Sequence, residues 1–393
     1  MNKGTTSRRL ILLALLGLQL TVASQPRLLL GGDLSLLPSY QQAGTVYKDY
    51  DGQAVSLLPF LHQEGWNAVR VRLFVNPDNA PQKHKGEGAC QSLSYILPLC
   101  QQIKQAGMQL MLDFHYSDYW ADPGKQTIPQ EWQGSTLEQL CDHVYRHTRT
   151  SLLALKAAGA EPELIQVGNE ITNGMLWPVA RLVPTEDEGW DRLCALIAAG
   201  CQACREVCPE SRIIIHTEKA GSWPVTAAYY EQLHRRNIDY DVIGLSYYPM
   251  WHKSIPNLGQ TLDSLQRYFP HKEVMIVETA AYYSHENDPW ATPDQYAEFY
   301  PITVEGQAQF TRELVRELSR HRNVTGLFWW FAEENAYCPP APAELAGRPQ
   351  RSSGDVVKAW LNRGLFSNRT GRALPALQEL KKYRPEAAST AKY

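Results

Sequence analysis

Two glutamates that close strongly apolar runs are the side chains best suited to chemistry. Glu170 ends the run LIQVGNE, and Glu278 stands near the end of EVMIVET. Two carboxyl groups that flank a sugar are the machinery of glycoside hydrolysis, in which one is a protonated acid and the other an ionised nucleophile or base. Their surroundings must then separate their pKa values. We interpret the two residues as such a pair; the alternative is that each only pairs with an arginine at the edge of the fold.

Polar residues beside the apolar runs could support this chemistry. Arg70 and Arg72 share a parity within a strand pattern, so both should point to the inner face, where an arginine keeps a nearby carboxylate ionised. A buried ion pair without a catalytic role predicts the same placement. Asn169, directly before Glu170, can bond a sugar 2-hydroxyl, although it could also be a turn residue that ends the strand.

Two groups of residues could be taken for metal sites. Asp113, His115 and His216 all lie near ends of apolar runs, but a catalytic metal needs three protein ligands in a fixed geometry, so we interpret the histidines as hydrogen-bonding residues. Cys201 and Cys204 form a CxxC within a helical pattern, and no second CxxC or histidine pair follows at zinc spacing. We therefore expect no metal in the active site.

Eight short, β-rich apolar runs must position these residues, and stretches with helical spacing lie between them. Near-continuous apolar strands that alternate with helices predict a parallel sheet covered on both faces. No linker divides the chain, so we expect a single (β/α)8 barrel with its active site at the C-terminal ends of the strands. A doubly wound sheet is the alternative, but its glycine-rich phosphate turn is missing after the first run. The runs are residues 28–33, 68–75, 108–115, 164–170, 212–217, 242–248, 273–279 and 324–331.

The composition is that of a globular protein with a large core. The 393 residues are 44% hydrophobic and 20% charged, with a formal net charge of −3, which excludes a disordered or fibrous chain. Without basic runs, nothing favours a nucleic-acid surface. The eleven tryptophans and twenty tyrosines suit core packing or a sugar-stacking groove. Those near strand ends or in loops could floor a groove or anchor loops: Trp120, Trp132, Trp177, Trp223, Trp251 and Trp290.

The N-terminus has the pattern of a signal peptide. Lys3, Arg8 and Arg9 precede an apolar stretch at 10–20, and small residues follow at 23–24. We predict cleavage of residues 1–24, which leaves the barrel domain in residues 25–393 and makes the protein secreted or periplasmic. A retained N-terminal anchor is the alternative. Some of the eight cysteines could then pair in an oxidising compartment, with partners that the sequence does not identify.

Several motifs together resemble the endo-β-1,4-galactanases of glycoside hydrolase family 53. They include DFHYSDYWADPGKQ, VGNEITNGMLWP and GLSYYP, and the resemblance covers nearly all of residues 25–393. It implies a retaining (β/α)8 hydrolase that cuts β-1,4-galactan, the side chain of pectic type I arabinogalactan, or galacto-oligosaccharides. Glu170 would be the acid/base and Glu278 the nucleophile. No cofactor and no protein partner are implied.

The resemblance also implies a set of substrate-binding residues. They are Arg70, Arg72, His115, Asp118, Asn169, Trp177, His216, Tyr247 or Tyr248, and Trp330. Three segments depart from the family pattern: Thr217-Glu218, Phe331-Ala332, and the loop after Glu278. In that loop some relatives hold a structural calcium, and this chain offers residues 285–288 without a clear ligand spacing. Another retaining glycanase, acting on mannan or xylan, and a non-catalytic glycan-binding protein remain the alternatives.

Overall fold

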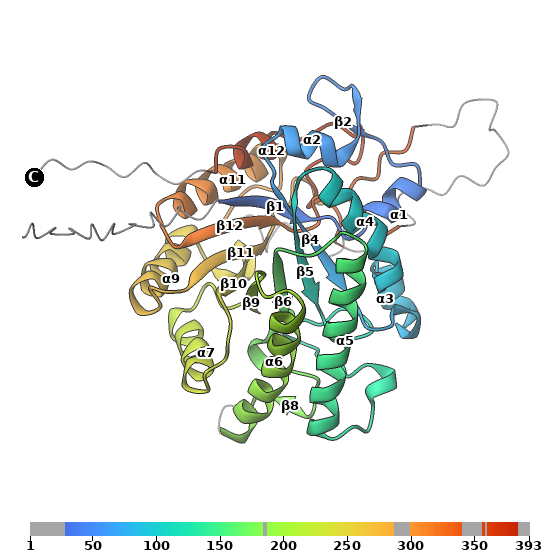
Figure 1. Ribbon diagram of the computed structural model, residues 1–393. Coiled ribbons are helices and arrows are strands. Elements are labelled where there is room, and N and C mark those ends of the chain that lie inside the picture. Colours follow the sequence, from blue (N-terminus) through green and yellow to red (C-terminus); the bar gives the residue numbers. More distant parts are fainter. Residues whose placement is uncertain (1–27, 184–186, 287–298, 340–355, 358–359, 384–393) are drawn as a thin grey trace, which may run out of the picture.

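The computed structural model describes residues 28–183, 187–286, 299–339, 356–357 and 360–383 (Figure 1). The predicted signal peptide therefore lies outside the described residues. Eight parallel strands close into a barrel in the order β1-β12-β11-β10-β9-β6-β5-β4, and the pairing of β1 with both β12 and β4 completes the circle. The predicted (β/α)8 fold is confirmed, and each predicted apolar run contains one of the barrel strands.

The barrel strands and the helices that follow them have these bounds. The strands are β1 Leu29–Asp33, β4 Ala68–Leu73, β5 Gln109–Phe114, β6 Leu164–Val167, β9 Arg212–Thr217, β10 Val242–Tyr247, β11 Glu273–Thr279 and β12 Val324–Trp329. The outer helices are α2 Leu57–Gln63, α4 Leu93–Gln105, α5 Leu137–Ala157, α6 Asp187–Val207, α7 Trp223–Arg235, α9 Ile255–Tyr268, α11 Val304–Ser319 and α12 Pro375–Leu380.

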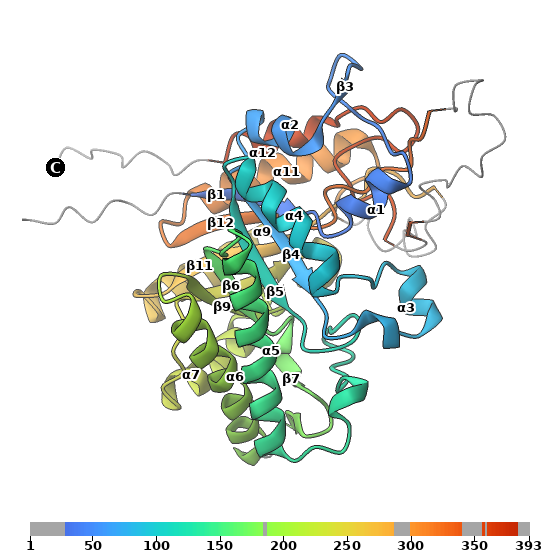
Figure 2. The same cartoon turned by 45° about the vertical axis from the view of Figure 1, so that its right-hand side comes forward.

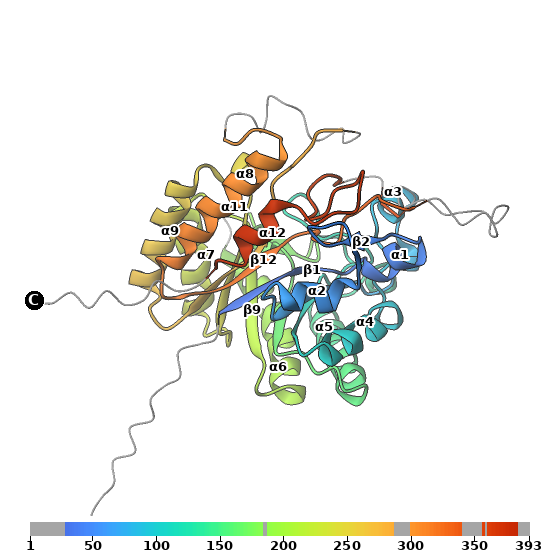
Figure 3. The same cartoon turned by 90° about the horizontal axis from the view of Figure 1, so that it is seen from above.

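Shorter elements lie in the loops between strands and helices. They are α1 Leu37–Gln42, α3 Gln82–Gly86, α8 Pro249–His252, the hairpins β2 Tyr47–Lys48 with β3 Ala54–Val55 and β7 Gly174–Met175 with β8 Ala180–Arg181, and the 3-10 turns η1 Pro77–Asn79, η2 Gln130–Trp132 and η3 Ile171–Asn173. The long helices α5 and α6 pack side by side (Figure 2). Helix α12 packs against α11 (Figure 3), as the helical pattern near the C-terminus indicates.

The inside of the barrel has an apolar floor beneath a polar layer. The floor is a separate buried cluster of Leu29, Ala68, Met111, Leu164, Ile214, Val242, Met275, Val277 and Phe328. Side chains two residues further along a strand point to the same face. On β4, β5, β6 and β9 those residues are polar and fully buried: Arg70, Asp113, Gln166 and His216. The shared inward parity predicted for Arg70 and Arg72 is therefore what the structure shows.

Strand β11 carries one more residue than either neighbour just before Glu278. Against β10, Leu245 pairs with Ile276 but Ser246 pairs with Glu278, and the register with β12 shifts in the same stretch. An extra residue of this kind locally re-aims the side chains that follow it. Val277 points into the barrel floor, and the extra residue lets Glu278 point inward as well.

The described residues also show the state of the cysteines and the character of the helices. All eight cysteines lie there, and all are free thiols. Cys201 and Cys204 are buried in α6, which agrees with the helical interpretation of the CxxC. Within the described ranges, every helix is too short or too polar to cross a bilayer.

Candidate active site

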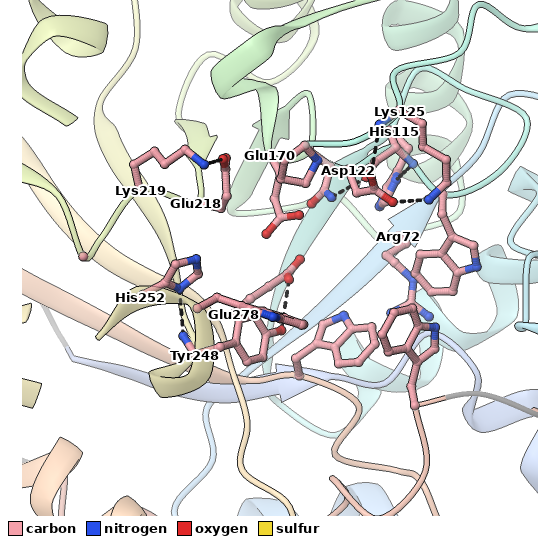
Figure 4. Close-up of a pocket in the computed structure, with 18 of the residues that line it drawn as sticks. Arg72, His115, Asp122, Lys125, Glu170, Glu218, Lys219, Tyr248, His252 and Glu278 are labelled. Carbon is pink, nitrogen blue, oxygen red and sulfur yellow. Dashed lines mark hydrogen bonds and ion pairs between the residues drawn. The ribbon is translucent and has the colours of Figure 1, made fainter. Parts of the chain in front are cut away.

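A cavity of about 470 Å³ opens at the C-terminal ends of the barrel strands. Glu170 and Glu278 lie in its middle, and their side chains point toward one another (Figure 4). Glu218 and Lys219 line one end, whereas Asp122 and Lys125 line the other. A sugar chain laid along the cavity would therefore pass between the two glutamates.

Glu278 is held by one cation and one phenol. Its Oε1 lies 2.9 Å from Nη2 of Arg70, and Tyr248 donates its hydroxyl to Oε2 at 3.2 Å. Burial raises the pKa of Glu278, and the charge of Arg70 opposes that rise. The ion pair thus favours the anionic form that a nucleophile needs.

Arg70 is the centre of a buried charge network. Besides Glu278 it pairs with Asp113 at 2.8 Å and with Asp33 at 3.1 Å, and it donates to Oδ1 of Asn169 at 2.9 Å. Burial alone would raise the pKa of Asp113, but Arg70 and His115 hold that pKa below its usual value. The network fixes the guanidinium, and with it the position of the Glu278 carboxylate.

Glu170 stands in a strained backbone position next to the other glutamate. Its φ of 48° lies in the left-handed region, which costs on the order of 1 kcal/mol or more for a residue with a side chain. Ser246 donates its hydroxyl to Oε1 of Glu170 at 2.7 Å. Burial raises the pKa of Glu170 well above its usual value, and the charges of Glu278 and Glu218 raise it further.

Burial thus raises the pKa of both glutamates, but only at Glu278 does a directly bound cation oppose the rise. Arg70 stabilises the negative charge of Glu278, while that charge in turn favours the protonated form of Glu170. Glu170 is therefore the more easily protonated of the two, which is the order that an acid and a nucleophile need in glycoside hydrolysis.

Aromatic rings form the walls of the cavity. Trp120 and Trp330 lie 6.3 Å apart in an edge-to-face contact, and the guanidinium of Arg72 lies 4.5 Å above the ring of Trp120. Trp251 and Trp360 line the cavity as well. Flat apolar faces flanked by hydrogen-bonding groups suit the binding of sugar rings.

Half of the residues predicted to bind substrate line the cavity, and two more lie just beneath it. Of the predicted set, Arg72, His115, Asn169, Tyr248 and Trp330 line it. Arg70 and His216 lie just beneath, because Arg70 contacts Glu278 and Asn169, while His216 bonds Ser246 and the backbone of Glu170.

The other three predicted substrate contacts neither line the cavity nor contact the two glutamates. Asp118 instead accepts backbone hydrogen bonds from Asn76 at 3.1 Å and Gln130 at 2.8 Å, so it holds two loops together. The indole N–H of Trp177 donates to the carbonyl of Asn173, and the guanidinium of Arg181 stacks over the indole ring. Both residues thus hold loops together, and substrate contact by either of them stays a prediction.

Tyr247 is the third of these residues. Its hydroxyl donates to the carbonyl of Lys253 and its ring stacks on Phe310, so of the two adjacent tyrosines it is Tyr248 that reaches the cavity. Among the other tryptophans, Trp132 stacks on His143 and Trp223 on Tyr268, as loop and helix anchors. Trp290 lies outside the described residues.

The histidines of the barrel are hydrogen-bonded within the network. Nδ1 of His115 accepts from the backbone N–H of Ala121, and its Nε2 faces Asp113 at 3.0 Å. Among the described residues, no three histidine, cysteine, aspartate or glutamate side chains gather as a metal site. In the loop after Glu278, Glu286 pairs with Arg369, while residues 287 and 288 of the proposed calcium loop lie outside the described part.

Comparison with known proteins identifies the family of this barrel. The sequence model of glycosyl hydrolase family 53 matches residues 29–380, which is nearly the whole barrel. The chain belongs to this family. A probable arabinogalactan endo-beta-1,4-galactanase A of Neosartorya fischeri is 31% identical, over 76% of this chain and 82% of that protein.

Two further family 53 comparisons cover a similar extent. An endo-beta-1,4-galactanase of Bacillus subtilis is 30% identical over 79% of this chain and 71% of its own length. The solved GH53 catalytic domain of Ignisphaera aggregans has a TM-score of 0.78 at 28% identity, and the match covers 91% of this chain and 96% of that one. Sequence and structure thus agree on the family.

One departure from the family pattern lines the cavity of this family 53 barrel, and a second packs behind its wall. Glu218 lines it, accepts a hydrogen bond from Thr172 and pairs with Lys219 at 2.6 Å. Phe331 packs on Trp330 and lies 5.7 Å from the guanidinium of Arg72.

Other members of the site were missed by inspection of the sequence. Asp33 and Ser246 contact the central charged residues, and Lys219, Trp360 and Arg363 line the cavity. Strand parity could have found Ser246, because it lies on β10 two residues before Tyr248, which follows the strand.

Proposed function

We propose that this protein hydrolyses internal β-1,4-galactosidic linkages of pectic galactan, as in type I arabinogalactan, with retention of configuration. The observation that carries the proposal is that Glu170 and Glu278 face one another in the cavity (Figure 4). Ser246 donates a hydrogen bond to Glu170, and Arg70 forms an ion pair with Glu278. Family membership and the galactanase names of its relatives support the same substrate.

In the proposed mechanism the two glutamates act in two displacements. The Glu278 carboxylate attacks the anomeric carbon while Glu170 gives its proton to the leaving glycosidic oxygen, so a galactosyl ester forms and the leaving chain departs as an alcohol. Glu170 then takes a proton from water, which attacks the anomeric carbon and frees Glu278. These steps need no cofactor.

The cavity extends to both sides of the two glutamates, and this supports cleavage of internal linkages. Arg72, Asp122 and Lys125 lie toward one end, whereas Glu218 and Lys219 lie toward the other (Figure 4). Sugar units can therefore be bound on both sides of the bond that is cut.

Product analysis on linear β-1,4-galactan tests the proposal. We expect galacto-oligosaccharides of mixed length at early times, and proton NMR should show the β-anomer of the new reducing end first. Mannan and xylan serve as controls. Cleavage of mannan or xylan in place of galactan would keep the mechanism and change the substrate, while binding of galactan without any product would favour a glycan-binding protein.

The ion pair between Arg70 and Glu278 predicts a pH effect. In Arg70→Lys a single ammonium replaces the guanidinium that serves three carboxylates, so the pKa of Glu278 should rise. Because the nucleophile must be ionised, the acidic limb of the kcat/KM profile should move upward by roughly one pH unit. Arg146→Lys, on the surface of α5, is the control, and an unmoved acidic limb in Arg70→Lys would contradict the assignment.

We also propose that the protein is exported, with residues 1–24 removed. The basic residues and the apolar run in that segment support this. Intact-mass measurement of the protein from the native host, together with cell fractionation, tests it. A mature chain that begins near residue 25 in the medium or periplasm is expected, and an uncleaved, membrane-bound chain would favour the anchor.

A further inference from the structure

Ser246 occupies an unusual position between a histidine and the proposed acid. It is fully buried on β10, and it is paired with Glu278 because of the extra residue in β11. Its Oγ lies 2.8 Å from Nε2 of His216 and 2.7 Å from Oε1 of Glu170. These are the hydrogen-bond partners of the hydroxyl within the described part of the chain.

The surroundings of His216 determine the direction of these hydrogen bonds. Its Nδ1 accepts from the backbone N–H of Glu170 at 3.4 Å, a group that can only donate, and the side-chain amide nitrogen of Gln166 lies 3.0 Å away. Oδ1 of Asn169 lies 3.1 Å from the same nitrogen and accepts from Arg70. Nδ1 is therefore an acceptor, and the ring hydrogen is on Nε2.

Burial and the charge of Arg70 keep this histidine neutral, because both lower its pKa well below the usual value. The Nε2–H of His216 then donates to Ser246, and the serine hydrogen must go to Glu170. The reverse arrangement, with Oε1 of Glu170 protonated and donating to Ser246, would leave the buried serine hydrogen without an acceptor.

We propose that Ser246, oriented by neutral His216, is a positioning residue that keeps a hydrogen bond on Oε1 of Glu170 throughout the reaction, so that the catalytic proton is always carried by Oε2. This inference rests on the proposed acid/base role of Glu170. It explains how one oxygen stays fixed in the protein while the other exchanges a proton with sugar and water in the cavity.

Removal of the hydroxyl should make Glu170 harder to ionise. A hydrogen bond from Ser246 stabilises the carboxylate more than the acid and so lowers its pKa. The other charged groups that face Glu170 are Glu278 from β11, Glu218 after β9 and Asp122 after β5. All three remain in Ser246→Ala.

Two pH limbs should therefore move in the same direction in Ser246→Ala. The basic limb of kcat/KM on galactan, where Glu170 must be protonated, should move upward by about one pH unit. With a dinitrophenyl β-galactobioside, deglycosylation limits kcat and Glu170 acts as the base, so the acidic limb of kcat should move upward as well. At a pH well below the pKa of Glu170, an upward shift of that limb by one pH unit lowers kcat tenfold.

Two variants serve as controls. Ser211→Ala removes another buried serine hydroxyl, which bonds the carbonyl of Pro162 far from the cavity, and its limbs should match the parent. Ser246→Thr keeps a hydroxyl and should restore the parent limbs. If the rate of Ser246→Ala falls but neither pH limb moves, the role of Ser246 is merely structural and the proposal is overturned. Limbs that move in opposite directions would overturn it as well.

A measurement without turnover separates this inference from the proposed function. In protein with carbon-13 in its glutamate carboxyl groups, the Glu170 signal, assigned with Glu170→Gln, should titrate at higher pH in Ser246→Ala than in the parent. Equal titration overturns the role of Ser246. A parent protein that cuts neither substrate contradicts the proposed function. In that case the titration still tests whether the hydrogen bond from Ser246 lowers the pKa of Glu170.

Discussion

Glu278→Ala should abolish nearly all hydrolysis of β-1,4-galactan. We expect kcat/KM to fall on the order of 10⁴-fold or more, because the variant lacks the carboxylate that forms the galactosyl ester. The fold should persist, since Arg70 keeps its ion pairs with Asp33 and Asp113. Initial rates on galactan with equal amounts of folded protein, checked by thermal unfolding, measure the effect.

Azide distinguishes a nucleophile from any other essential residue. In Glu278→Ala, azide can enter the space of the lost carboxylate and displace dinitrophenolate from a dinitrophenyl β-galactobioside, which yields the α-azide. Glu138→Ala, an exposed change on α5, should retain parent activity. A β-azide from Glu278→Ala would mean that this residue is not the nucleophile.

Glu170→Ala should show a loss that depends on the leaving group. On galactan, whose leaving alcohol needs a proton, kcat/KM should fall by about 10²–10⁴-fold. On the dinitrophenyl substrate, whose leaving group departs without a proton, kcat/KM should change little, while kcat falls because no base activates water. The measurement is a comparison of both substrates in the parent and the variant.

The outcome with azide should be the opposite of that for Glu278→Ala. Azide needs no general base, so it should intercept the galactosyl ester of Glu170→Ala, raise kcat on the dinitrophenyl substrate and yield the β-azide. Equal losses on galactan and the dinitrophenyl substrate, with no effect of azide, would contradict an acid/base role for Glu170.

Much of the fold could be predicted from the sequence for a simple physical reason. A barrel strand is buried on both faces, so each appears as a short apolar run, and a run of this kind is visible without knowledge of its neighbours. Period-2 alternation also placed Arg70 and Arg72 on the inner face. The barrel and the candidate pair Glu170 and Glu278 therefore followed from local pattern and family motifs.

Strand parity alone fails at Glu278. Met275 and Val277 point into the barrel floor, so a regular strand would turn Glu278 outward. The extra residue in β11, visible only against β10 and β12, reverses this. The motif identified the residue, but pairing between strands that are distant in sequence decided where its carboxylate points.

Motif strength also did not indicate which residues line the cavity. Asp118 and Trp177 lie in the most specific segments, yet the structure uses both to hold loops. Ser246, in contrast, is an inconspicuous residue whose role depends on His216 and on the left-handed backbone of Glu170.

The sequence by itself determined the barrel, the family and the identity of the two candidate glutamates, because burial pattern and motif are local properties. Only the tertiary structure decided that Arg70 stabilises the charge of Glu278 and that Ser246 bonds Glu170. Protonation states depend on burial and on charges a few ångströms away, and those neighbours come from strands far apart in the chain.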